Sequence, residues 1–186
     1  TMFDTAKRNW AWDILERFGL PAGLFPEVKE SSDIAGTISP FCAAETGLPA
    51  GVPVIYGSGD QPAQSIGNGV IKGGRIISNI GTGGQISAFA SSPAYDKKLR
   101  TNTFCHGIRG GYTIFGATLC SGMSLNWAKN KVLHVDSYQE VNALVSAVPP
   151  GAEGLIYLPY LSGERTPHMN PDAKGVFFGM TLGQER

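Results

Sequence analysis

The feature that most constrains the fold is a pair of apolar segments joined by four small residues. The segments are residues 75–80, which contain three isoleucines, and residues 85–90, which contain isoleucine, phenylalanine and two alanines. The connection consists of Gly81, Thr82, Gly83 and Gly84. Two strand-like segments around a short glycine-rich connection are typical of a β-hairpin. The sequence therefore predicts two paired strands with a small-residue turn between them.

Further elements are predicted on both sides of this hairpin. Before it we expect a helix over 5–18 capped by Asp4, irregular chain over 20–53 with a short strand at 36–38, a strand at 53–57 and a helix at 62–68. After it we expect strands at 112–117, 154–160 and 175–181, and helices over 121–131 and from Ser137, where Ser137 and Glu140 form a capping box.

The order of these elements predicts the fold class. Three strands in sequence, followed by helices and a returning strand, are typical of an α/β, ribonuclease-H-like lobe of the actin-like ATPase superfamily. A glycine-rich segment at 69–74 is the predicted boundary. We therefore expect residues 1–70 to end one lobe and residues 71–186 to begin the next.

Composition excludes several functional classes. Apolar residues make up 42% of the chain and charged residues 16%, with a net charge of zero. Such a chain can bury a core, but it offers no basic face for nucleic acid. No apolar run is long enough for a membrane span, so no membrane partner is expected. Cys42, Cys105 and Cys120 show no paired spacing, which favours reduced thiols in a cytoplasmic protein.

Asp60 is the first candidate functional residue. It follows an apolar strand and lies after Gly57 and Gly59, which leave room for a ligand beside the backbone. A carboxylate at the end of a strand is a common functional position in α/β proteins. The structural alternative is that Asp60 caps the helix at 62–68, and the two roles are compatible.

The hairpin Gly81 to Gly84 is the second candidate. Successive backbone N–H groups of small residues suit phosphate oxygens, and the Thr82 hydroxyl adds a donor. An ordinary glycine-rich hairpin is the alternative. No Walker A lysine follows, so the segment is not a P-loop.

Gly122 and Asn126 form the third candidate because they lie four residues apart on one helix face. A packing glycine and a surface asparagine are the alternative. The polar loop 162–168 is the fourth candidate. Its Glu164–Arg165 pair would either brace the loop or contact a ligand, and bracing is the favoured role. His168 in this loop, and His106 and His134 elsewhere, have no metal-ligand spacing to other residues, so no metal site is predicted.

Four segments together resemble the FGGY carbohydrate kinases. They are G-S-G-D-Q at 57–61, N-I-G-T-G-G at 79–84, S-G-M-S-L-N-W at 121–127 and the long run L-P-Y-L-S-G-E-R-T-P-H-M-N-P at 158–171. They occur in the family's order and cover nearly the whole chain. The last segment is highly specific, whereas the glycine-rich ones alone are not.

The resemblance implies a catalytic role and a set of ligands. Asp60 would be the base that deprotonates a sugar hydroxyl, and Gln61 would contact the sugar. Gly81, Thr82, Gly83 and Gly84 would hold ATP phosphates, with Mg²⁺ as the accompanying ion, and Gly122 and Asn126 would line the nucleotide site. Within the resemblance, the sequence at 161–168 favours xylulose as the substrate, and gluconate, ribulose and glycerol are the alternative substrates.

A non-catalytic nucleotide-binding module is the alternative from another class. The resemblance also places the family's first phosphate-binding hairpin and most of its sugar site before residue 1, and the rest of the adenosine pocket after Arg186. We therefore expect this chain alone to be inactive and to expose apolar surface, which would allow a homo-oligomer.

Overall fold

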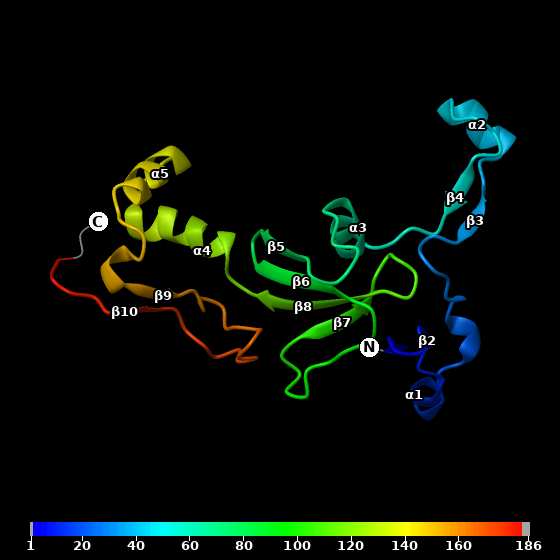
Figure 1. The fold of residues 1–186 in the computed structure, drawn as a ribbon, viewed down its shortest axis with the longest axis horizontal. Helices are drawn as coiled ribbons and strands as arrows, with labels where there is room; N and C mark the ends of the chain where they lie inside the picture. Colours follow the sequence, from blue (N-terminus) through cyan, green and yellow to red (C-terminus); the bar gives the residue numbers. More distant parts are fainter. Residues whose placement is uncertain (1, 184–186) are drawn as a thin grey trace. The chain divides into compact units, whose positions relative to one another are not determined.

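The main element of the chain is a four-stranded sheet. A computed structural model describes residues 2–183 and shows an α/β fold (Figure 1). The strands are β5 (Ile76–Ile80), β6 (Gly84–Ala90), β7 (Asn102–Cys105) and β8 (Tyr112–Thr118), in the order β5-β6-β8-β7. Three of them confirm the strands predicted at 75–80, 85–90 and 112–117.

Strand β7 was not predicted. It has four residues, and its sequence N-T-F-C carries no extended apolar pattern. The structure instead shows a turn directly after this strand, in which the backbone N–H of His106 donates to the carbonyl of Gly111 at 2.9 Å. The strand therefore depends on pairing with chain that follows it rather than on its own composition.

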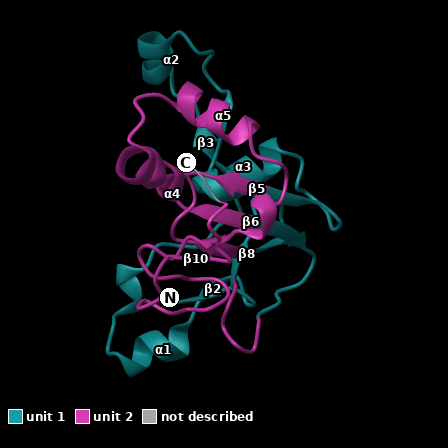
Figure 2. Cartoon of the chain, turned by 90° about the vertical axis from the view of Figure 1, so that its left-hand side faces the viewer, with its two compact units in different colours: residues 1–77, 87–95, 102–114 teal, residues 78–86, 96–101, 115–186 magenta. Residues whose placement is uncertain are grey.

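The described residues form two compact units (Figure 2). Unit 1 contains the residues up to Ile77 together with 87–95 and 102–114, and unit 2 contains 78–86, 96–101 and the residues from Phe115 onward. Each unit combines several stretches of chain. The predicted division into lobes at residues 70 and 71 stays a prediction.

The helix predicted over 5–18 is shorter in the structure. Two short strands, β1 (Phe3–Asp4) and β2 (Asn9–Trp10), pair antiparallel and precede α1 (Trp12–Arg17). Asp4 accepts from the N–H of Lys7 in a turn, and Arg8 has a left-handed φ of 52°. The Arg8 guanidinium donates to both carboxylate oxygens of Glu30 at 2.8 and 2.7 Å. The left-handed backbone of Arg8 cannot be part of a right-handed helix. The same residue pairs with Glu30, which is distant in the sequence.

The segment predicted to be irregular contains regular structure. Helix α2 (Pro40–Thr46) lies between β3 (Ile34–Thr37) and β4 (Pro53–Ile55), which pair antiparallel, and a 3₁₀ turn, η1, covers Ala22–Leu24. Ser39 caps α2 by accepting from the N–H of Cys42 at 3.1 Å. Gly47 ends the helix with a φ of 75°. A serine cap, a proline in the first turn and a terminal glycine were all legible signals.

Unit 2 carries the remaining helices. Helix α4 (Gly122–Trp127) continues into the π-helical segment η2 (Ala128–Leu133), and α5 (Tyr138–Ser146) follows. Ser137 caps α5 as predicted, because its Oγ accepts from the N–H of Glu140 at 3.2 Å. Strands β9 (Ile156–Leu158) and β10 (Val176–Phe178) pair with each other after the short turn η3 (Ala152–Gly154). In the described residues, β9 does not return to the main sheet.

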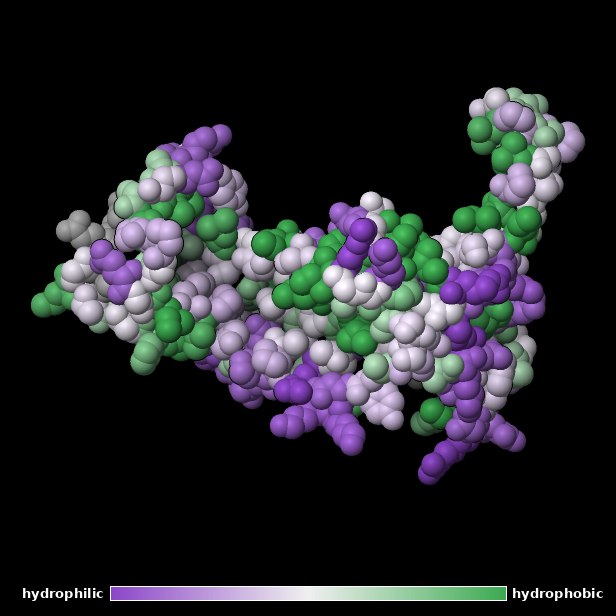
Figure 3. Space-filling view, in the orientation of Figure 1, coloured by the Kyte–Doolittle hydropathy of each residue, from purple (hydrophilic) through white to green (hydrophobic). Residues whose placement is uncertain are grey.

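Much apolar surface is exposed. Among residues 2–183, the largest fully buried side chains are those of Leu15 and Cys120, whereas Phe41 is 77% exposed and Ile80 76% exposed. Figure 3 shows such apolar residues gathered in patches on the visible face. Contiguous apolar patches of this kind are typical of surfaces that other protein segments cover. No helix among residues 2–183 has the length and apolar character needed to cross a membrane.

Asp96 and Arg100 form a charged turn between β6 and β7. The Asp96 carboxylate accepts from Nε and Nη2 of Arg100 at 2.6 and 3.1 Å, and from its backbone N–H at 3.1 Å. The Arg100 side chain thereby holds the pKa of Asp96 well below its usual range.

Replacing Asp96 with Asn should therefore lower stability in a pH-dependent way. A carboxylate whose pKa is lowered by folding stabilises the protein above its unfolded pKa of about 3.9, and this contribution is lost as the pH falls towards the folded value. The melting-temperature gap between wild type and variant should be largest near pH 6 and should narrow below pH ~4. Asp136→Asn, at an exposed loop position, is the control. A gap that is constant with pH would contradict this origin.

Candidate functional site

Asp60 begins a helix and does not cap it. Strand β4 leads through Gly57 to Gly59, which is the N-cap residue of α3 (Asp60–Gly67) and makes no side-chain cap bond. The Asp60 Oδ1 atom accepts from the N–H of Gln61 at 2.7 Å. The cap interpretation of Asp60 is therefore wrong. Asp60 and Gln61 are both exposed in the first turn, where a negative charge is favoured by the helix dipole.

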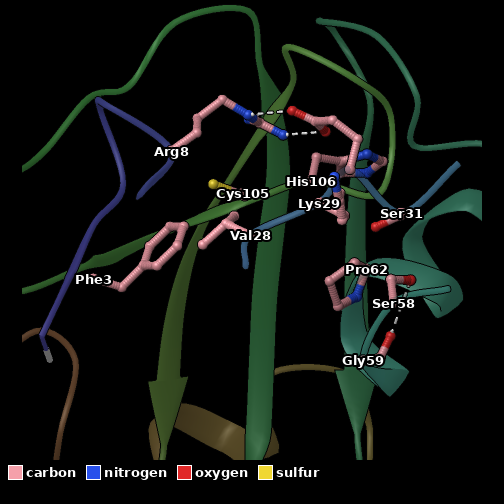
Figure 4. Close-up of a pocket in the computed structure, with 11 residues that line it drawn as sticks. Phe3, Arg8, Val28, Lys29, Ser31, Ser58, Gly59, Pro62, Cys105 and His106 are labelled. Carbon is pink, nitrogen blue, oxygen red and sulfur yellow. Dashed lines mark hydrogen bonds and ion pairs between the residues drawn. The ribbon is translucent and has the colours of Figure 1, made fainter. Parts of the chain in front are cut away.

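A small pocket in unit 1 lies beside this segment (Figure 4). It has a volume of about 190 Å³, and Ser58 and Gly59 contribute to its wall. The arginine in its wall is already paired within the protein. Arg8 forms an ion pair with Glu30 and donates a further hydrogen bond to the carbonyl of Gly111 at 3.0 Å. Burial lowers the pKa of His106 in the same wall, so this imidazole stays neutral near pH 7. The pocket therefore offers few free charges to a ligand.

The hairpin between β5 and β6 has an excess of free backbone donors. Its carbonyls are all occupied: Gly81 O accepts from Gly122 N at 2.8 Å, Thr82 O accepts from Ser121 N and Met123 N at 3.0 and 3.1 Å, and Gly83 O accepts from Gly81 N at 2.9 Å. The N–H groups of Thr82 and Gly83 have no acceptor in the described part of the chain. A turn with satisfied acceptors and free donors is suited to an anion such as phosphate.

Two glycines make this arrangement possible. A Cβ atom on Gly83 would lie 2.6 Å from the carbonyl oxygen of Thr118, and one on Gly122 would lie 2.6 Å from the carbonyl oxygen of Gly81. These contacts are far shorter than a carbon and an oxygen tolerate, and both partners are backbone atoms. Gly83 and Gly122 are therefore required for the hairpin to pack on β8 and on the start of α4. This is the packing role considered for Gly122.

Asn126 lies one turn further along α4. Its Oδ1 accepts from Asn130 Nδ2 at 2.8 Å and from the Tyr138 hydroxyl at 3.4 Å. These bonds link α4 to its own continuation and to α5. The structure thus brings Gly122 against the hairpin, while Asn126 is engaged within the helical layer. A nucleotide-binding role for either residue stays a prediction.

The loop after β9 packs onto β8, which the sequence did not reveal. Glu164 is only 4% exposed, and its Oε1 accepts from the N–H of Leu119 at 3.1 Å and of Arg165 at 2.6 Å. The hydroxyl of Thr166 accepts from the N–H of Ala117 at 3.2 Å. The predicted bracing of this loop therefore occurs, but through backbone N–H groups of β8, of Leu119 just after it and of the loop itself. In the sequence, the acidic residue between Gly163 and Arg165 was the signal that could have indicated this packing.

A second pocket lies next to the hairpin in unit 2. It has a volume of about 250 Å³, and it is lined by Asn79, Gly83, Gly84, Gln85, Ala117, Thr118, Leu119 and Arg165. It therefore combines Gly83, one of the two hairpin residues with a free N–H group, with one cationic side chain. Among residues 2–183, no group of three or more His, Cys, Asp or Glu side chains could hold a metal ion. Any Mg²⁺ at this site would be held mainly by phosphate and water oxygens, as is usual for this ion.

The α/β fold is that of the actin-like ATPases, with a carboxylate at the start of α3 and a donor-rich hairpin between β5 and β6. Residues 1–67 match the N-terminal domain of the FGGY family of carbohydrate kinases, and residues 77–185 match the C-terminal domain of that family. The chain belongs to the FGGY family of carbohydrate kinases.

Individual relatives agree with this assignment. A xylulose kinase of Bacillus subtilis is 36% identical over 180 residues, covering 97% of this chain and 36% of the relative. A gluconokinase of the same organism is 29% identical, covering 96% of this chain and 36% of the relative. A crystal structure of a xyloylose kinase from Brucella ovis superposes with a TM-score of 0.89 at 29% identity, covering 99% of this chain and 38% of that one. The chain spans about a third of the length of these relatives.

Removing the Glu164 carboxylate should destabilise the protein. In Glu164→Ala the N–H groups of Leu119 and Arg165 lose their acceptor in a partly buried place, and the loss should cost about 1–3 kcal/mol in total, the value for one fully buried unsatisfied donor. Denaturant unfolding should show a loss of that size. Glu45→Ala, at an exposed position on α2, should change the free energy of unfolding by less than about 0.5 kcal/mol. Equal effects of the two variants would contradict the bracing role.

Proposed function

We propose that the protein carrying this chain transfers the terminal phosphate of ATP to a sugar hydroxyl. The observation that carries the proposal is the hairpin with occupied carbonyls and free N–H groups, found in a member of a carbohydrate-kinase family. Sugar and ATP are thus the proposed ligands, with Mg²⁺ on the ATP phosphates. Because the relatives are much longer than this chain, we expect the chain alone to lack useful activity.

Xylulose is the proposed sugar, with xylulose 5-phosphate as product. Xylulose kinases of several bacteria are 32–36% identical to this chain, which supports the proposal. Gluconate is the main rival, because a gluconokinase is 29% identical over nearly the same span. Turnover of xylulose, gluconate, ribulose and glycerol by the full-length protein tests the order of preference.

In this mechanism Asp60 is the general base. Its carboxylate would accept the proton of the sugar hydroxyl as that oxygen forms a bond to the γ-phosphorus, while the bond from phosphorus to the bridging oxygen of ADP breaks. Gln61, the next residue of α3, would hold the sugar by a hydrogen bond. The exposed carboxylate suits this role, because its one hydrogen bond comes from the adjacent N–H of Gln61 and leaves its other oxygen available.

The hairpin would position the phosphate chain of ATP. The free N–H groups of Thr82 and Gly83 and the Thr82 hydroxyl would donate to phosphate oxygens, which bear most of the charge in phosphoryl transfer. Catalysis of this reaction depends mainly on such positioning and on charge neutralisation. A non-catalytic nucleotide-binding module would need the hairpin but would not need Asp60.

Asp60→Asn in the full-length protein should lower kcat for sugar phosphorylation by about 10²–10⁴-fold, because the amide cannot accept the proton. The dissociation constant for ATP should change less than about twofold, since the site for phosphate is elsewhere in the chain. Asp13→Asn is a matched control, because it also removes a carboxylate from the first turn of an exposed helix. Near-normal turnover in Asp60→Asn would exclude Asp60 as the base and would favour the binding-module alternative.

Thr82→Val should weaken ATP binding roughly 10-fold, the value of one hydrogen bond to a charged group, and leave the KM for the sugar unchanged. The exchange keeps the side-chain shape, and Thr82 is exposed, so folding should be preserved. Calorimetric titration with ATP and Mg²⁺ measures the effect. Thr37→Val on the exposed strand β3 is the control. Unchanged affinity in Thr82→Val would reduce the hydroxyl to a surface group.

A further inference from the structure

The loop that follows β9 presents one arginine from a fixed backbone. Gly163 has a φ of +80°, and a Cβ on it would lie 2.5 Å from the carbonyl oxygen of Pro171, so the loop turns where only glycine fits. Glu164 then exchanges two backbone hydrogen bonds with Asn170, at 2.8 and 2.9 Å. The chain entering Arg165 is therefore held on both sides of the loop.

The residues on either side of Arg165 are bound to β8 and to Leu119, which follows that strand. The Glu164 carboxylate accepts from Leu119, and Thr166 accepts from Ala117 and donates to the carbonyl of Arg100 at 2.5 Å. Arg165 lies between these two attachments and lines the pocket next to the hairpin. Its place beside the hairpin is thus determined by the backbone, and its long side chain is exposed.

The Arg165 guanidinium has no acidic partner among the described residues. Three other arginines are paired with carboxylates: Arg8 with Glu30, Arg100 with Asp96 and Arg109 with Asp33. Arg17 and Arg75 also have no acidic partner among the described residues, but neither lines the pocket next to the hairpin. The adjacent carboxylate of Glu164 does not neutralise Arg165, because it is buried and accepts from two backbone N–H groups. An unpaired guanidinium therefore adds a positive charge to a pocket that is also lined by Gly83, whose N–H is free, next to Thr82 in the hairpin.

We propose that Arg165 binds the phosphate chain of the nucleotide together with the N–H groups of Thr82 and Gly83. A guanidinium presents several donors in one plane and pairs with two phosphate oxygens at once. The inference rests on the proposed function, since it assigns a further residue to the same nucleotide site. It explains why Arg165 is held by an anchored loop although its own side chain supports no part of the fold.

The test compares nucleotides that differ in phosphate number. In the full-length protein, Arg165→Gln should raise the dissociation constants for ATP and for inorganic tripolyphosphate by about 10- to 100-fold, as expected for a lost charged hydrogen-bond donor. The dissociation constant for AMP should change less than about threefold, because AMP has a single phosphate near the ribose. Arg165→Lys should give an intermediate loss, since lysine keeps the charge but not the planar fork.

Lys174→Gln is the matched control, because it removes an exposed positive charge from the end of the same loop outside the pocket. The melting temperatures of Arg165→Gln and wild type should agree within about 1 °C, which would exclude a structural effect, since the Arg165 side chain makes no bond that the fold uses. An equal loss for ATP and AMP, or a loss as large in Lys174→Gln, would overturn the role of Arg165.

The outcomes also separate this inference from the proposed function. If the wild-type protein binds ATP and phosphorylates a sugar while Arg165→Gln binds ATP normally, the inference on Arg165 fails and the proposed function stands. If the wild-type protein binds neither ATP nor tripolyphosphate, both fail.

Discussion

The contact between the hairpin and the start of α4 is the interaction on which the candidate phosphate site depends. Three N–H groups at the beginning of α4, which no helical carbonyl can satisfy, donate to the carbonyls of Gly81 and Thr82. The same bonds therefore complete the helix terminus and occupy the acceptors of the hairpin. What remains on the hairpin is an excess of donors, so the proposed preference for an anion follows from how the two elements pack rather than from the glycines alone.

The sequence predicted the parts of this arrangement that depend on local chemistry. Strands β5, β6 and β8 and helix α5 follow from apolar patterns and a serine cap, and the hairpin follows from its four small residues. The early helix was overestimated because Arg8 has a positive φ and is paired with Glu30, 22 residues away. The occupied carbonyls of the hairpin and the acceptor role of Glu164 also depend on distant partners. Helix α2 is different, because its cap and its terminal glycine were visible in the sequence.

Charge pairing explains why a chain with no net charge can still offer a positive site. Carboxylates are placed against arginines at Glu30, Asp33 and Asp96, and these pairs contribute to turns and strand ends. Glu164 is instead used for backbone N–H groups, although an arginine is its neighbour in sequence. Local charge at the hairpin is therefore set by which carboxylates are already engaged, and net charge carries no information about it.

The proposed site bears on the type of reaction more directly than on the identity of the sugar. A general base and donors to phosphate oxygens would serve the transfer of phosphate to a hydroxyl whatever carbon skeleton carries that hydroxyl. Relatives named for xylulose and for gluconate match the same span of this chain at 36% and 29% identity. Discrimination between sugars needs groups that pair with each hydroxyl, because unpaired polar groups in a site are what reject a wrong substrate. Gln61 is the one side chain here proposed for that task, so sugar choice must rest largely on groups other than those that carry the chemistry.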